Sequence, residues 1–258
     1  MNEITQTVQE KHGAIARARG GASCCDTTSC CGGGDPITSH LYADGETEGL
    51  PPDAVAVSLG CGNPTALAAL EPGQVVLDLG SGGGIDVLLS AKRVGPTGKV
   101  YGLDMTDDML ALARENQQKA GVTNVEFLKG TIDAIPLPSN SVDVIISNCV
   151  INLALDKDAV FREALRVLKP GGRLAVSDVV SRGDVPAAIR QDVELWAGCI
   201  AGALDENDYS ARLSRAGFSD VTLEPWRVYE EYGGNFASSF IRATKPEARS
   251  CCGPTCCN

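Results

Sequence analysis

The sequence is poor in histidine, in aromatic residues and in clustered positive charge. Of its 258 residues, two are histidine and 5% are aromatic, while 22 basic and 33 acidic residues give a formal charge of -11. No run of consecutive Lys/Arg residues is longer than two. Because binding to a phosphate backbone needs concentrated positive charge, we do not expect nucleic acid as a partner.

Long apolar runs and the layout of a signal peptide are also missing. No stretch approaches the roughly 20 apolar residues that a membrane-spanning helix needs, and residues 1–18 lack the charged-then-apolar order of a secretory signal. A composition of 43% hydrophobic and 21% charged residues is typical of a folded globular chain. We expect a cytoplasmic monomer without membrane contact, built as one large domain or a domain with an appendage.

Cysteine, by contrast, is abundant, with 11 residues. Cytosolic thiols are kept reduced, so this number indicates metal, metalloid or redox chemistry rather than a disulfide framework. The cysteines form an N-terminal cluster, a C-terminal cluster and three single positions. They are, in that order, Cys24, Cys25, Cys30 and Cys31; Cys251, Cys252, Cys256 and Cys257; and Cys61, Cys149 and Cys199.

Short apolar runs alternate with helical patterns through the middle of the chain. Strands separated by helices predict an α/β fold with a doubly wound, mostly parallel sheet of seven strands. We expect three parts: a helix and Cys-rich cap over 1–58, the sheet domain over 59–245 and a mobile Cys-rich tail over 246–258. The expected strands are 75–79, 100–103, 125–128, 142–147, 173–176, 221–224 and 238–242; the expected helices are 3–17, 86–93, 107–119, 158–168, 186–198 and 206–216.

A glycine-rich loop, Gly80 to Gly84, follows the first strand of the sheet. Such a loop lets the backbone turn sharply and brings a ligand against main chain at a helix N-terminus. The spacing is not the G-x-G-x-x-G of a dinucleotide site, because Ile85 and Val87 occupy the sixth positions. About 20 residues on, Asp104 ends the second strand, where a carboxylate can accept both ribose hydroxyls of an adenosine. The alternatives are a tight turn and a helix N-cap.

The region from Val75 to Asp178 resembles the class I, Rossmann-like S-adenosylmethionine methyltransferases, through the glycine loop, Asp104 and the Lys169-Pro170-Gly171-Gly172 turn. The resemblance implies S-adenosyl-L-methionine as cofactor, in the crevice at the carboxyl ends of the strands. The cofactor-binding residues it implies are Gly80, Ser81, Gly82, Gly84, Asp104, Met105, Thr131, Ile132 and Asn148.

The three single cysteines border this crevice in such a fold. Cys61 lies in a tight turn before the first strand, Cys149 at the end of the fourth and Cys199 beyond the fifth. A thiol is a poor general base but a good soft ligand. Three thiolates in a chain with two histidines favour a thiophilic centre, and trivalent arsenic fits. Alternatively, each cysteine could be a small buried hydrophobe.

At these positions the chain resembles arsenite S-adenosylmethionine methyltransferases, through Gly60-Cys61-Gly62, residues 146–153 and Gly198-Cys199. The resemblance implies that arsenite or its thiol conjugate is bound at Cys61, Cys149 and Cys199. The arsenic lone pair then takes the methyl group without a catalytic base. Cys61 also forms a disulfide with Cys24 or Cys25, which supplies electrons, and thioredoxin or glutathione reduces it.

Several alternatives stay open. The tail cysteines Cys251, Cys252, Cys256 and Cys257 are predicted to capture arsenic, but Cys-only zinc sites also fit their spacing and that of the N-terminal cluster. His12 and His40 are expected at the surface. The rival functions are methylation of an organic small molecule and non-catalytic binding of a metalloid or zinc. The number of methyl groups added is also open, as is which of Cys24, Cys25, Cys30 and Cys31 takes the redox role.

Overall fold

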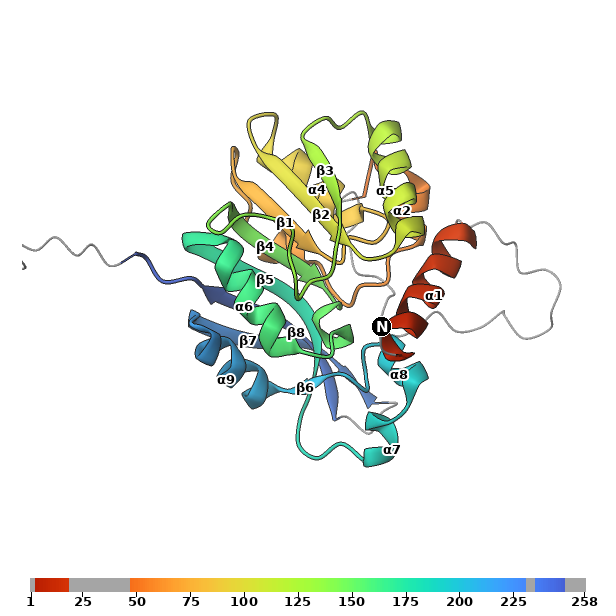
Figure 1. The fold of residues 1–258 in the computed structure, drawn as a ribbon, viewed down its shortest axis with the longest axis vertical. Coiled ribbons are helices and arrows are strands. Elements are labelled where there is room, and N and C mark those ends of the chain that lie inside the picture. Colours follow the sequence, from red (N-terminus) through yellow and green to blue (C-terminus); the bar gives the residue numbers. More distant parts are fainter. Residues whose placement is uncertain (1–2, 19–46, 231–234, 249–258) are drawn as a thin grey trace, which may run out of the picture.

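The apolar runs of the sequence form one mixed sheet in the computed structural model, which describes residues 3–18, 47–230 and 235–248 (Figure 1). The strand order is β3-β2-β1-β4-β5-β8-β7, and a short strand, β6, pairs with β5 outside this path. Neighbouring strands among β1 to β5 are parallel to one another, while β8 is antiparallel to both β5 and β7. The predicted doubly wound sheet is therefore confirmed, with an additional strand.

The elements of the described ranges have the following bounds. The strands are β1 (Val75–Leu79), β2 (Lys99–Asp104), β3 (Val125–Lys129), β4 (Val142–Asn148), β5 (Leu168–Ser181), β6 (Leu204–Asp205), β7 (Ser219–Tyr229) and β8 (Phe236–Thr244). The helices are α1 (Glu3–Ala18), α2 (Pro52–Ala56), α3 (Pro64–Leu67), α4 (Ile85–Val94), α5 (Asp107–Ala120), α6 (Lys157–Val167), α7 (Ala187–Arg190), α8 (Val193–Ala197) and α9 (Glu206–Ala216), with a 3-10 turn, η1 (Ile151–Leu153).

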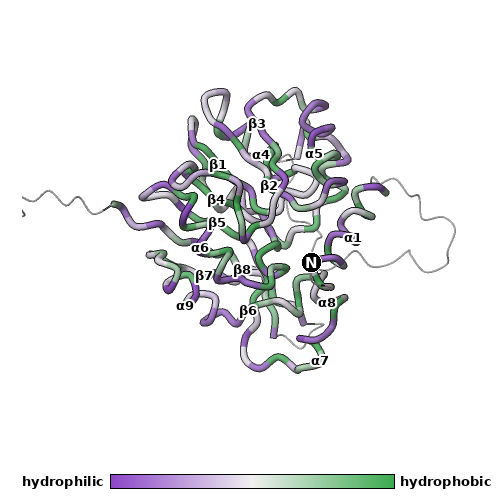
Figure 2. The backbone as a smooth tube through the Cα atoms, viewed as in Figure 1, coloured by the Kyte–Doolittle hydropathy of each residue, from purple (hydrophilic) through white to green (hydrophobic). Residues whose placement is uncertain are grey.

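Helices cover both faces of the sheet. Side chains alternate along a strand, so Val76 and Val144 pack with α4 and α5 on one face, while Leu77 and Ile145 pack with α6 and α9 on the other. Figure 2 shows that hydrophobic residues are concentrated in the central strands and that hydrophilic residues are frequent on the outer helices. Burial on both faces explains why the central strands are almost continuously apolar.

Several element boundaries differ from the sequence prediction, and β7 and β8 are both longer than expected. Strand β5 is much longer than the expected 173–176, because β8 pairs with it from Arg173 to Ser181. The expected helix over 186–198 is instead two short helices, α7 and α8. The Asp192 carboxylate accepts a hydrogen bond from the Leu195 amide at 3.0 Å, which starts a new helix at this point.

Helix α1 was predicted over 3–17 and lies beside α5 and α8 (Figure 1). Its buried residue Ala16 packs in one cluster with Met109 and Leu112 of α5. The helix is thereby held against the sheet domain, although residues 19–46 lie outside the described part of the chain. Among the helices of the described ranges, none combines the length and apolar character needed to cross a bilayer.

Replacing Phe161 with alanine tests the packing of α6. The Phe161 side chain is fully buried, and its ring centroid lies 5.3 Å from that of Tyr209. Because the change leaves a cavity, Phe161→Ala should lower the free energy of unfolding by about 3–5 kcal/mol, as measured by urea denaturation. Leu155→Ala, at a side chain that is 48% exposed, is the control and should change it by less than about 0.5 kcal/mol.

Candidate active site

A cavity of about 390 Å³ opens at the carboxyl ends of β1, β2 and β4. In the parallel register Leu79 pairs with both Leu103 and Ser147, so these three strands end side by side. Gly84, the N-cap of α4, is not among the lining residues. The cavity is lined by eight of the nine predicted cofactor residues: Gly80, Ser81, Gly82, Asp104, Met105, Thr131, Ile132 and Asn148.

The glycine loop forms the floor of this cavity in a conformation that favours glycine. Gly80 and Gly82 have φ angles of 76° and 49°, which side chains with a Cβ rarely adopt. A Cβ at Gly80 would also lie 2.4 Å from a methyl group of Val150. The buried Ser81 hydroxyl has no hydrogen-bond partner within the described structure. An exposed loop backbone and an unpaired hydroxyl are the features that a polar adenosyl ligand would fit.

Asp104 is positioned by the backbone around it. Its Oδ2 accepts a hydrogen bond from the Gly82 amide at 3.0 Å, and its Oδ1 accepts one from the Thr106 amide at 2.8 Å. The N-cap of α5 is Thr106, not Asp104, so the alternative of a helix cap is wrong. Each carboxylate oxygen keeps a further lone pair that can accept a ribose hydroxyl.

Two further carboxylates at this site were missed by the sequence reasoning. Asp78 is a buried residue of β1 that lines the cavity, and burial, followed by the charges of Asp86 and Asp104, raises its pKa well above the usual range. Asp86 accepts a hydrogen bond from the Asn148 side chain at 3.1 Å. The sequence could have indicated Asp78, because it is a single acidic residue in an otherwise apolar strand. Burial of a carboxyl group costs free energy, so such a residue is a candidate for a functional role.

Helix α1 forms the roof of the cavity and corrects the expectation for His12. The histidine is half-buried and lines the cavity, together with Val8 and Ile15 of the same helix. Burial lowers the His12 pKa, while the nearby Asp104 carboxylate opposes this shift. His40 lies outside the described residues. The cofactor side of the cavity is thus enclosed by a segment that the sequence reasoning assigned to a cap.

The three single cysteines meet at the inner end of the cavity. All three are free and buried, and they belong to one packed cluster. Cys149 and Cys199 line the cavity, whereas Cys61 lies behind them. The Cys199 thiol donates a hydrogen bond to the Cys149 carbonyl, with a distance of 2.7 Å between sulfur and oxygen. The structure thus packs cysteines from three distant segments into one cluster, but the group whose ligand atoms lie within 4.8 Å of one another contains Cys61 and Cys149 and not Cys199.

The backbone at two of these cysteines adopts a conformation that is uncommon for residues other than glycine. Cys149 and Cys199 have φ angles of 62° and 66°, in the left-handed region that residues with a Cβ seldom occupy. The Asn148 side chain holds the Cys61 turn, since it accepts from the Cys61 amide and donates to the Gly62 carbonyl, both at 2.8 Å. A Cβ at Gly60 would lie 2.2 Å from the Asn148 amide nitrogen. Strain of this kind concentrates at functional sites.

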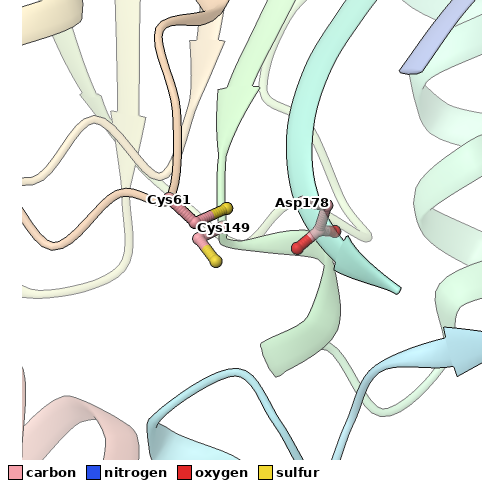
Figure 3. A group of neighbouring side chains, drawn as sticks. All are labelled: Cys61, Cys149 and Asp178. Atoms are coloured by element: carbon pink, nitrogen blue, oxygen red, sulfur yellow. The ribbon is translucent and has the colours of Figure 1, made fainter. Parts of the chain in front are cut away.

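Asp178 of β5 joins the thiols and was not anticipated from the sequence. One of its carboxylate oxygens and the sulfurs of Cys61 and Cys149 all lie within 4.8 Å of one another (Figure 3). Burial raises the pKa of Asp178 to about 7, against the opposing effect of the Lys157 charge. The only signal was a pair of polar residues, Ser177-Asp178, inside an apolar stretch whose strand was predicted to end at 176.

The chemistry available at this end of the cavity is that of soft ligands. Burial, together with the neighbouring thiols of Cys199 and Cys61, raises the pKa of Cys149 well above its usual range. The thiol is therefore protonated at neutral pH and unsuited to act as a base. A thiophilic centre that displaces the proton can still bind it. The remaining predicted cysteines, Cys24, Cys25, Cys30, Cys31, Cys251, Cys252, Cys256 and Cys257, lie outside the described residues.

The sheet order, the glycine loop and the strand-end Asp104 define the class I S-adenosylmethionine-dependent methyltransferases. A family described as "Methyltransferase domain" matches residues 70–217. The chain is 41% identical to an arsenite methyltransferase of Halobacterium salinarum, over 95% of this chain and 67% of that protein. It is also 41% identical to one of Aquipseudomonas alcaligenes, over 78% of this chain and 57% of that protein.

Among solved structures, an arsenic (III) S-adenosylmethionine methyltransferase from Chlamydomonas reinhardtii is 34% identical, with a TM-score of 0.63 over 78% of this chain and 75% of that one. The chain thus belongs to the arsenite methyltransferase family. It spans 67% and 57% of the lengths of the two curated relatives.

The role of Asp104 is tested by removing its charge. Asp104→Asn should raise the Kd for S-adenosylmethionine about tenfold to a hundredfold, because a hydrogen bond to a charged group contributes about 1.5–3 kcal/mol. Isothermal titration calorimetry measures the Kd. Asp107→Asn is the control, since that carboxylate forms an exposed pair with Lys129 and should leave the Kd unchanged. Equal affinities in the two variants would contradict the assignment.

The protonation of Cys149 is tested by alkylation. Its raised pKa lowers the thiolate fraction at any given pH, so iodoacetamide should modify Cys149 at pH 8 at least about tenfold more slowly than it modifies free cysteine. Mass spectrometry of peptides from the native protein follows the reaction. Unfolding in urea should abolish the difference, and equally fast modification of the native thiol would contradict it.

Proposed function

We propose that this chain transfers the methyl group of S-adenosylmethionine to trivalent arsenic held by cysteine thiolates. The observation that carries the proposal is the convergence of three free, buried cysteines at the inner end of a cavity whose outer part suits an adenosyl ligand. Thiolates are the ligands that soft centres prefer. The names of the curated relatives support arsenic as that centre.

In this proposal Cys149 and Cys199 hold arsenic at the wall of the cavity and Cys61 is the third ligand. Arsenic bound by three thiolates keeps a lone pair, so the acceptor needs no general base. The high pKa of Cys149 fits this role, because the thiol loses its proton only when arsenic replaces it.

The remaining residues hold the two substrates in place. Asp104 would bind the ribose hydroxyls of the methyl donor, and the backbone of the Gly80–Gly82 loop would contact the rest of its adenosyl part. The donor supplies an electrophilic methyl group on a sulfonium sulfur. Asn148 ties the Cys61 turn to the end of β4, so the thiol cluster and the cofactor loop keep a fixed relation. Fixed geometry of this kind is what methyl transfer between two bound groups requires.

We also propose the substrate, the reductant and the compartment of the reaction. Arsenite, or its thiol conjugate, is the substrate. Cys61 and either Cys24 or Cys25 form a disulfide that thioredoxin or glutathione reduces, and the tail cysteines deliver arsenic. The three free thiols support a reducing compartment, the cytoplasm. We also propose a monomer, with a cap over 1–58, a methyltransferase domain over 59–245 and a tail over 246–258.

The test of the function is direct. Purified protein is incubated with arsenite, S-adenosylmethionine and a reducing thiol, and arsenic species are separated by chromatography and detected by arsenic mass spectrometry. Methylated arsenic should appear only when the methyl donor is present. Binding of both substrates without any methylated product would contradict the proposal and favour a metalloid-binding protein, whereas failure to bind arsenite would favour an organic substrate.

Cys149→Ser should abolish arsenic methylation, with a fall of at least about a hundredfold, because a hydroxyl does not replace a soft thiolate ligand. The Kd for S-adenosylmethionine should stay within about twofold of the wild-type value, as measured by calorimetry. The control is the double variant Cys251→Ser/Cys252→Ser, which should keep its rate at saturating arsenite. Retained methylation by Cys149→Ser would contradict the thiolate mechanism.

A further inference from the structure

A buried carboxylate lies beside the thiols of Cys61 and Cys149 and is not part of the lining of the cofactor cavity. Asp178 has no exposed surface, and its carboxylate projects from β5 toward the sulfurs of Cys61 and Cys149 (Figure 3). Cys149 and Cys199 line the cavity, but Cys61 and Asp178 do not. A centre bound to Cys61 and Cys149 would therefore lie close to a carboxylate that is not part of the cavity lining.

Burial raises the pKa of Asp178 to about 7, and neighbouring groups offset part of this cost of the charged form. The Val179 amide donates to Oδ1 at 3.1 Å, and the Tyr209 hydroxyl donates to Oδ2 at 3.4 Å. The positive charge of Lys157, which is itself only 6% exposed, also favours the anion. A buried acid and a buried lysine contribute less to stability than apolar side chains of the same volume. The position of Asp178 beside the thiols therefore favours a role for this carboxylate in the reaction.

We propose that the Asp178 carboxylate stabilises the positive charge that arrives on arsenic during methyl transfer. The inference rests on the proposed function and assigns to this chain a charge-stabilising residue in addition to the three thiols.

The charge balance of the transfer defines this role. Three thiolates bound to trivalent arsenic form a neutral complex. The arsenic lone pair forms the new As–C bond, while the C–S bond of the sulfonium breaks and both of its electrons stay on sulfur. Arsenic is oxidised formally from III to V, sulfur becomes a neutral thioether, and no proton or further reagent takes part. One positive charge thus moves from sulfur to arsenic.

The place at which this charge arrives matches the position of Asp178. The methyl donor approaches from the cavity, and the charge that it brings arrives on arsenic beside the Asp178 carboxylate, which does not line the cavity. A preorganised charge in a water-excluded site stabilises the transition state more than the ground state when charge develops beside it. The carboxylate need not bind arsenic, because the thiolates are the softer ligands, and it stays free to act through its field.

The experiment compares the wild-type chain with Asp178→Asn, which keeps the shape and removes the charge. Arsenite is bound first, S-adenosylmethionine is added to protein in excess, and methylated arsenic is followed in a single turnover. The rate should fall about tenfold to a hundredfold, while the Kd values for arsenite and for S-adenosylmethionine stay within about twofold. Asp178→Glu should recover part of the rate.

The matched control is Asp143→Asn. Asp143 is also a strand aspartate beside a lysine, with 2.8 Å between its Oδ1 and the Lys169 amino group. Asp143 is the second residue of β4, so it lies at the end of the strand opposite to the cavity. This variant should transfer the methyl group at the wild-type rate.

A second variant separates chemistry from stability. Asp178→Asn leaves Lys157 without its counter-charge, which can destabilise the fold, so the pair is also changed together as Asp178→Asn/Lys157→Met. Thermal unfolding should show that this double variant is as stable as the wild type, yet its transfer should stay as slow as that of Asp178→Asn. Recovery of the rate in the double variant would overturn the proposal.

Two further results would overturn it. The first is an unchanged single-turnover rate in Asp178→Asn with wild-type methylation intact, which would leave the proposed function standing. The second is an arsenic–oxygen bond to Asp178, detected by X-ray absorption at the arsenic edge and lost in Asp178→Asn, because the carboxylate would then be a ligand. A wild-type chain that forms no methylated arsenic overturns the proposed function and this inference with it.

Discussion

The hydrogen bonds of Asn148 are the constraint on which the site depends. One amide side chain joins the end of β4 to the Cys61 turn, 87 residues away in sequence, and also contacts Asp86 at the start of α4. The glycine at position 60 leaves room for it. Because Asn148 both lines the cofactor cavity and positions a thiol, the two halves of the site cannot move independently.

Burial gives the two halves different chemistry. At the cofactor end, carboxylates and backbone amides line the cavity. Burial, followed by the charges of Asp86 and Asp104, raises the pKa of Asp78 well above its usual range. At the inner end, the same exclusion of water keeps the Cys149 thiol protonated and makes any fixed charge effective. The Asp178 carboxylate lies in the same environment, and burial raises its pKa to about 7.

Much of the fold could be predicted from the sequence, because its elements depend on local patterns. The apolar run at β1, the glycine loop after it and the amphipathic pattern of α9 are each visible within a few residues. Errors arose where a distant partner decided the outcome. Strand β5 is long because β8 pairs with it from the far end of the chain, and no local pattern reports such pairing.

The sequence by itself determined which residues are available for soft-ligand chemistry and which strand ends carry polar groups. Only the tertiary structure decided that Asp178 lies beside the thiols, that Cys61 is deeper than Cys149, and that His12 faces the cavity. The reason is physical: strand register and helix packing set the direction of each side chain, and both result from contacts between segments far apart in sequence. Cys61 and Ser177, for instance, meet at 3.7 Å across 116 residues.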